Sequence, residues 1–142
     1  MKFLNASEYY DADVIILGGD MTGKAVIPIV EERDGTYRAT FLDHKEVMTS
    51  KDEVDQLKKK IGVAGYYPYL TDYKEIEQLE ANPERVDRLF KDLMLQGIER
   101  WINIADKRLR GKRVKCFVCP GNDDQSEIDR IIEKSESVTL AA

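Results

Sequence analysis

Asp13-Val-Ile-Ile-Leu-Gly-Gly-Asp20-Met-Thr-Gly-Lys24 joins an apolar run to glycines and a carboxylate. A similar arrangement occurs near the other end of the chain, at Val114-Lys-Cys-Phe-Val-Cys-Pro-Gly121-Asn122-Asp123-Asp124. A continuous β-branched run without polar alternation is typical of a parallel strand covered on both faces. We therefore predict two neighbouring core strands whose polar tips lie at one edge of a sheet.

Length and composition limit the class of protein. A chain of 142 residues that is 42% hydrophobic and 35% charged is expected to form one domain with its own core. The formal charge of -5 argues against a nucleic-acid-binding surface as the main function. No apolar run approaches the roughly 20 residues that span a bilayer, and the N-terminus lacks a signal-peptide pattern. We therefore expect a cytoplasmic protein that does not bind membranes.

The first half of the chain contains recognisable start, stop and turn signals. A short helix is expected over residues 2–10, and Asp34-Gly35 predicts a hairpin between residues 26–30 and 37–42. Ser50-Lys-Asp-Glu53 is a capping box that opens a helix expected to stop at Gly62.

The second half is dominated by one long helix. Residues 65–70 are expected to form an aromatic loop, after which Thr71 caps a short helix. Asn82-Pro83 opens a long helix that continues toward Leu109. A further helix is expected after Asp124, with a last strand from Val138.

These elements predict an α/β fold. Residues 1–142 are expected to form one domain. The segment of residues 26–112 is too long to be a plain crossover between two neighbouring strands. We interpret that segment as a hairpin and helices inserted between the two core strands.

The polar tips carry ligands suited to hard cations. In open α/β sheets, ligands bind beyond the carboxyl ends of the strands, where Asp20 and Asn122 are expected to lie. Carboxylate and amide oxygens bind hard divalent cations, and the neighbouring glycines allow close approach of the backbone.

Gly19-Asp20 and Gly121-Asn122, each after an apolar strand and in this order, resemble two motifs of the calcineurin-like metallophosphoesterase superfamily. The resemblance implies a β-sandwich flanked by helices, of which this chain forms part, and hydrolysis of a phosphoester small molecule or nucleotide. It also implies two divalent metal ions, with Mn, Fe, Zn and Ni left open, which activate a bridging water and clamp the phosphoryl oxygens. Asp20 then bridges the two metals, and Asn122 binds the second.

The sequence departs from the family at several motifs. The family's Asp-x-His and Gly-His-x-His motifs are absent, and His44 is the single histidine. Asp123 stands where the family has the histidine of Gly-Asn-His-Asp/Glu, which acts near the leaving group. As a catalytic acid, Asp123 needs a raised pKa. We expect a segment of a longer enzyme, with weak metal binding and little activity on its own.

Other interpretations remain open. Gly18–Lys24 satisfies the G-x-x-x-x-G-K pattern of a nucleotide-binding P-loop, although Ala25 supplies no hydroxyl and a poor helix sequence follows. A metallophosphoesterase-like scaffold without catalysis is the third possibility. Asp124 is also a candidate helix N-cap.

Four further groups have structural interpretations. Cys116 and Cys119 lie within one predicted strand and are expected to pack rather than to form a redox pair. His44 is expected at the surface. Four tyrosines are expected to stabilise the inserted segment: Tyr66, Tyr67, Tyr69 and Tyr73. A basic cluster is expected at a solvated helix end: Arg108, Arg110, Lys112 and Arg113.

Overall fold

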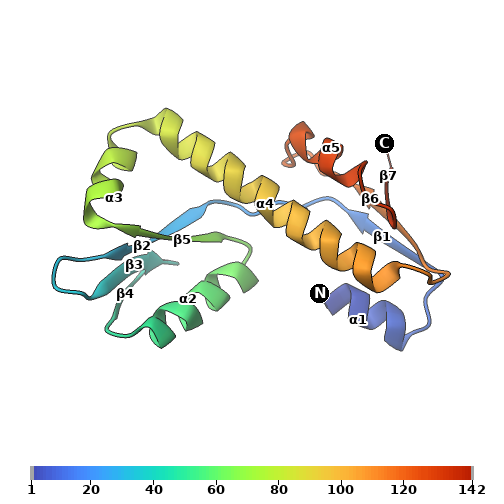
Figure 1. Ribbon diagram of the computed structural model, residues 1–142, viewed down its shortest axis with the longest axis horizontal. Helices are drawn as coiled ribbons and strands as arrows, with labels where there is room; N and C mark the ends of the chain where they lie inside the picture. The colour runs from blue at the N-terminus through green and yellow to red at the C-terminus, as the bar shows by residue number, and fades with distance from the viewer. Residues whose placement is uncertain (1, 142) are drawn as a thin grey trace. The chain divides into compact units, whose positions relative to one another are not determined.

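The computed structural model describes residues 2–141, which form a mixed α/β structure with five α-helices, a parallel three-stranded sheet and a mixed four-stranded sheet (Figure 1). The chain divides into two compact units. One unit comprises Met1–Thr22 and Leu95–Ala142, and the other comprises Gly23–Met94. The second unit therefore lies, in chain order, between the two strands expected to form the core.

The first unit contains the parallel sheet, in the order β1-β6-β7. Its strands are β1 (Val14–Gly18), β6 (Lys115–Cys119) and β7 (Val138–Leu140). Its helical parts are α1 (Lys2–Tyr9), the C-terminal part of α4 (Pro83–Leu109), the single 3₁₀ turn η1 (Ser126–Ile128) and α5 (Asp129–Ile132). The predicted parallel pairing of the two apolar strands is confirmed, with Val14 opposite Lys115 and Gly18 opposite Cys119.

Only one face of β1 is buried. Ile15 is 8% exposed, whereas Ile16, which points to the opposite face, is 68% exposed. The expectation that β1 is covered on both faces is therefore wrong for the described residues. The continuous apolar run nevertheless predicted the parallel pairing of β1 correctly.

The core of the first unit lies between the buried face of the sheet and the helices. It is formed by apolar side chains from every helical part of the unit: Leu4, Ile98, Ile102, Ala105, Leu109, Ile128 and Ile132. The rings of Phe3 and Trp101 pack together at a centroid distance of 5.8 Å, which joins α1 to α4.

The second unit contains the mixed sheet, in the order β4-β3-β2-β5. Its strands are β2 (Val26–Glu31), β3 (Tyr37–Phe41), β4 (His44–Met48) and β5 (Tyr67–Asp72). Its helices are α2 (Lys51–Val63), α3 (Tyr73–Glu80) and the first part of α4. The predicted hairpin is confirmed as the antiparallel pair of β2 and β3. Apolar side chains of the sheet and of α2 form its core: Ile29, Tyr37, Ala39, Met48, Val54, Leu57 and Ile61.

Two strands of this sheet were not expected. β4 follows a two-residue turn in which Leu42 and Asp43 both have positive φ, at 50° and 63°. Such a turn usually contains glycine or asparagine, so no turn signal is visible at Leu42 and Asp43. β5 replaces the expected aromatic loop, because β-prone tyrosines pair with β2 and Pro68 is tolerated in an edge strand.

The helix boundaries follow the expected capping chemistry with small shifts. The Ser50 and Glu53 capping box is confirmed. The helix runs past Gly62 to Val63, and the residue with positive φ after it is Gly65. Asp72, not Thr71, caps α3, because its carboxylate accepts from two backbone amides of the first turn.

The long helix predicted from Asn82-Pro83 toward Leu109 is confirmed as α4. No helix within residues 2–141 is long and apolar enough to cross a bilayer.

Candidate functional site

The two polar tips predicted from the sequence belong to neighbouring parallel strands. β1 ends at Gly18 and β6 ends at Cys119, and these two residues are partners in the sheet register. The amide of Gly19 donates to the carbonyl of Cys119 at 2.7 Å, so the pairing continues one residue beyond β1. Asp20 and Asn122 therefore leave the sheet at the same edge, because parallel strands end on the same side.

Two glycines allow the backbones beyond the strands to approach closely. A Cβ atom placed on Gly121 would lie 2.9 Å from Cα of Gly19 and 3.1 Å from N of Asp20. Gly19 also has φ of +83°, a conformation that side chains disfavour. Glycine is therefore required at both positions for these two turns to lie in contact.

Asp124 joins the same two turns through hydrogen bonds. One carboxylate oxygen accepts from the amides of Met21 and Gly121, at 3.1 and 2.8 Å. The other oxygen accepts from the amide and the hydroxyl of Thr22, both at 3.0 Å. Burial alone would raise the pKa of Asp124, but these hydrogen bonds outweigh it and hold the pKa below the usual range.

This role differs from the expected helix cap. Gln125, not Asp124, precedes η1, and no side chain caps that turn. The expected helix is also short, with η1 followed by the four residues of α5. The role of Asp124 was missed because its partners Met21 and Thr22 lie 103 and 102 residues away in sequence.

The three predicted site residues are exposed. Asp20 has φ of +53°, and Asn122 and Asp123 form the turn after β6. Asp20 also lines a cavity of about 410 Å³, together with Phe3, Trp101 and other residues of the first unit. The side chains are thus accessible to a ligand at the sheet edge.

The oxygen atoms of Asp20 and Asn122 match the preference of hard divalent cations. Their number falls short of a full shell, because octahedral sites take about six ligands. No group of three or more His, Cys, Asp or Glu side chains within residues 2–141 is placed to hold a metal ion. Asp20 and Asn122 therefore have the oxygen atoms that hard cations prefer, but the described residues do not form a complete metal site.

No protein-family model matches the chain, and no curated protein or solved structure shows significant similarity to it.

The loop after β1 lacks the geometry of a P-loop. A P-loop leads into a helix whose N-terminus faces the phosphates, whereas Gly18–Lys24 leads into strand β2. The amides of Met21 and Thr22 already donate to Asp124, and the amide of Lys24 donates to the carbonyl of Gly65. These backbone donors are therefore not directed at a phosphate.

The basic cluster at the end of α4 is largely paired. Arg108 and Lys112 both contact Glu8 of α1, and Arg110 contacts Glu136. Hydrogen bonds from Lys112 and Arg108 hold the pKa of Glu8 below its usual range. These contacts connect surface elements of the first unit and give no indication of a phosphate site.

Both cysteines lie on one strand, β6, as expected, and both are free thiols. Cys116 is buried, and burial raises the pKa of its thiol. His44, at the start of β4, is exposed, also as expected.

Each of the four tyrosines contacts a residue of the second unit. The partners are Phe41 for Tyr66, Gly23 and Phe90 for Tyr67, Glu75 for Tyr69, and Arg33 for Tyr73.

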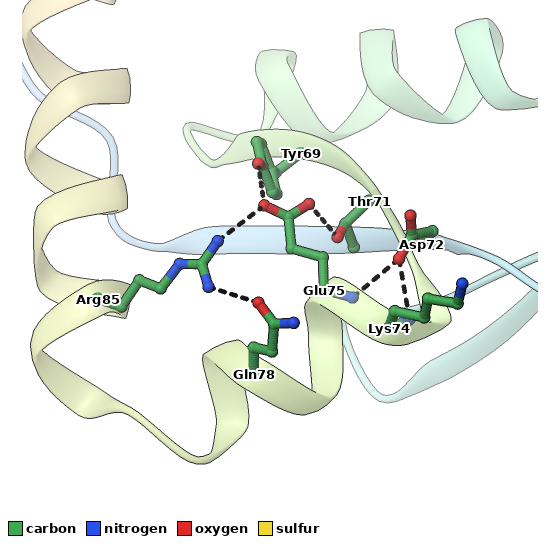
Figure 2. Close-up of polar contacts among 7 residues, drawn as sticks. All are labelled: Tyr69, Thr71, Asp72, Lys74, Glu75, Gln78 and Arg85. Atoms are coloured by element: carbon green, nitrogen blue, oxygen red, sulfur yellow. Dashed lines mark hydrogen bonds and ion pairs between the residues drawn. The ribbon is translucent and has the colours of Figure 1, made fainter.

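A second polar cluster lies in the second unit and was not anticipated from the sequence. Figure 2 shows the Glu75 carboxylate accepting from the hydroxyls of Tyr69 at 2.9 Å and Thr71 at 2.6 Å. Arg85 of α4 forms an ion pair with Glu75 at 3.7 Å and donates to Gln78 at 2.7 Å. The cluster connects β5, α3 and the start of α4, and every polar group named here has a partner in it. We therefore interpret it as a structural network.

Proposed function

We propose that this chain supplies two ligands of a metal-dependent phosphoesterase site, Asp20 as the bridging carboxylate and Asn122 as the ligand of the second metal. The observation that carries the proposal is the contact between Gly19 and Gly121, which brings the residues after them to one edge of the sheet. This arrangement is what the resemblance to calcineurin-like metallophosphoesterases implies for the two motifs. Bound divalent cations would supply an activated water and electrostatic stabilisation of a phosphoester.

The proposal extends to the fold. We infer that the parallel sheet of β1, β6 and β7 is one layer of a metallophosphoesterase-type β-sandwich. Support comes from the outer face of β1, where Val14 and Ile16 are 48% and 68% exposed. Apolar side chains on a sheet face are stabilised when a second layer covers them.

Asp123 is proposed to act beside the leaving group. It is exposed and directly follows Asn122 in the turn after β6. An aspartate donates a proton only while it is protonated, so Asp123 would act as the acid in its protonated form. Replacement by asparagine, which has a similar shape but no acidic proton, would then slow the release of poor leaving groups more than that of good ones.

Two oxygen ligands bind a cation weakly, so further ligands are needed for efficient hydrolysis. We expect residues 1–142 alone to hydrolyse bis(p-nitrophenyl) phosphate at the background rate in the presence of Mn²⁺. Robust Mn²⁺-dependent hydrolysis by the pure chain would contradict this account. The coding sequence on both sides provides a second test, because an in-frame Asp-x-His motif upstream and a Gly-His-x-His motif downstream would supply the further ligands.

The second candidate is a metallophosphoesterase-like scaffold without catalysis. The observation that favours it is the lack of any group of three metal-ligating side chains among residues 2–141. The two candidates differ at Asp20. In a polypeptide that contains all ligands, Asp20→Asn abolishes hydrolysis if the site is catalytic and leaves partner binding unchanged if the chain is a scaffold.

A further inference from the structure

The carboxylate of Asp124 is surrounded by hydrogen-bond donors from both turns of the candidate site. An ionised carboxylate only accepts hydrogen bonds, and its two oxygens can accept about four. Asp124 uses this capacity on three backbone amides and one hydroxyl, from Met21, Thr22 and Gly121. The turn after β1 and the turn after β6 are therefore connected through one side chain.

The connected residues are the immediate neighbours of the proposed ligands. Met21 follows Asp20, and Gly121 precedes Asn122. Asp20 has φ of +53°, which is uncommon for a residue with a side chain and persists only where the surroundings determine it. The hydrogen bonds to Met21 and Thr22 fix the backbone directly after Asp20, and so they can maintain that conformation.

We propose that Asp124 is a positioning residue that sets the relative placement of Asp20 and Asn122 without binding the metal or the substrate. This inference rests on the proposed function, because it assigns Asp124 a role toward the same ligands. Side chains that orient metal ligands affect metal affinity about 10- to 100-fold in other proteins. Asp124 is bonded to the backbone beside the ligands, so its effect acts through the turns.

A carboxylate suits this position because all four of the hydrogen bonds to Asp124 come from donors. Asparagine has nearly the same shape but one acceptor oxygen, and its NH₂ group would face either the Thr22 donors or the Met21 and Gly121 amides. The Thr22 amide, or the Met21 and Gly121 amides, would then lose their partner, since the Thr22 hydroxyl can turn to accept from the NH₂ group. Asp124→Asn is therefore a conservative change in volume that removes up to half of the connection.

The test measures backbone protection and metal affinity separately, by amide NMR of the whole chain. In Asp124→Asn we expect faster hydrogen exchange either at Thr22 or at Met21 and Gly121, with unchanged exchange in the middle of β6. Mn²⁺ affinity, measured from the paramagnetic broadening of the Asp20 and Asn122 amides, is expected to fall about 10-fold or more. Gln125→Ala is the matched control, because Gln125 is exposed and its side chain caps nothing.

Rescue distinguishes positioning from general destabilisation. Asp124→Gly leaves the donors around a space for a small carboxylate, and added formate should restore both amide protection and Mn²⁺ affinity. Formate should have no effect on Gln125→Ala. If the Asp124 variants do not fold, Thr22→Val removes only the hydroxyl donor and should lower Mn²⁺ affinity by a smaller factor.

Each outcome bears on the proposal. Normal protection in Asp124→Asn overturns it, and so does lost protection with unchanged Mn²⁺ affinity. If the unmodified chain shows no Mn²⁺ broadening at Asp20 and Asn122, the proposed function and the positioning role fall together. In that case lost protection in Asp124→Asn shows that the connection between the turns exists without serving a metal site.

Discussion

The contact between Gly19 and Gly121 can be tested with one methyl group. In Gly121→Ala the new Cβ would lie 2.9 Å from Cα of Gly19 and 3.1 Å from N of Asp20. Favourable contacts between carbon atoms lie at about 3.5–4.0 Å, so the overlap with Cα is about 0.6 Å or more. Both neighbouring atoms belong to the backbone and cannot rotate away as a side chain would.

The expected magnitude follows from two opposing terms. Overpacking of this kind typically costs about 1–3 kcal/mol. Replacing glycine lowers the entropy of the unfolded chain, which stabilises the folded state by about 0.4–1 kcal/mol. We therefore expect Gly121→Ala to lower the free energy of unfolding by about 1–2 kcal/mol.

Gly18→Ala is a matched control on the adjoining strand. A Cβ on Gly18 would meet no atom within 4 Å, and Gly18 does not have a positive φ. Its substitution should change the free energy of unfolding by less than about 0.5 kcal/mol, or stabilise the chain slightly.

Urea denaturation followed by Trp101 fluorescence provides the assay. Trp101 is the single tryptophan and belongs to the same unit as both turns. Equal midpoints for Gly121→Ala and Gly18→Ala, with unchanged slopes, would refute the close approach of the two turns.

Three further predictions concern other parts of the chain. Ser50→Ala removes the N-cap of α2 and should lower stability by about 0.5–2 kcal/mol, measured by urea denaturation with circular dichroism. The pKa of Tyr69 is raised by burial and by its hydrogen bond to Glu75, so Glu75→Gln should lower the pKa of Tyr69. NMR titration of the Tyr69 ring measures this change, and an unchanged pKa would contradict the contact. Cys116 is buried with a raised pKa, so iodoacetamide should modify Cys119 first, and faster modification of Cys116 would place it at the surface.

The features that could be predicted depend on local signals. The Ser50 capping box and the Asn82-Pro83 helix start each bring together residues close in sequence, and both were located correctly. The parallel pairing of β1 with β6 also followed from the sequence, because two apolar runs ended in similar polar tips. Pattern and local chemistry were sufficient for these elements.

The features that could not be predicted depend on tertiary contacts or unusual turns. β4 follows a turn at Leu42 and Asp43 without the glycine that usually marks such a turn. β5 contains Pro68, which reads as a loop until the strand is placed at a sheet edge. The hydrogen bonds of Asp124 join residues more than 100 positions apart, and no local pattern indicates them.

Paramagnetic relaxation by Mn²⁺ tests the central claim most directly. In amide NMR spectra of the chain, increasing Mn²⁺ should first broaden the signals of Asp20 and Asn122 and of their immediate neighbours. Asp20→Asn should greatly weaken that broadening, because it removes the charged ligand. Broadening that is confined to other acidic positions, such as Glu77 and Glu80 of the second unit, would contradict the metal site proposed at the edge of the parallel sheet.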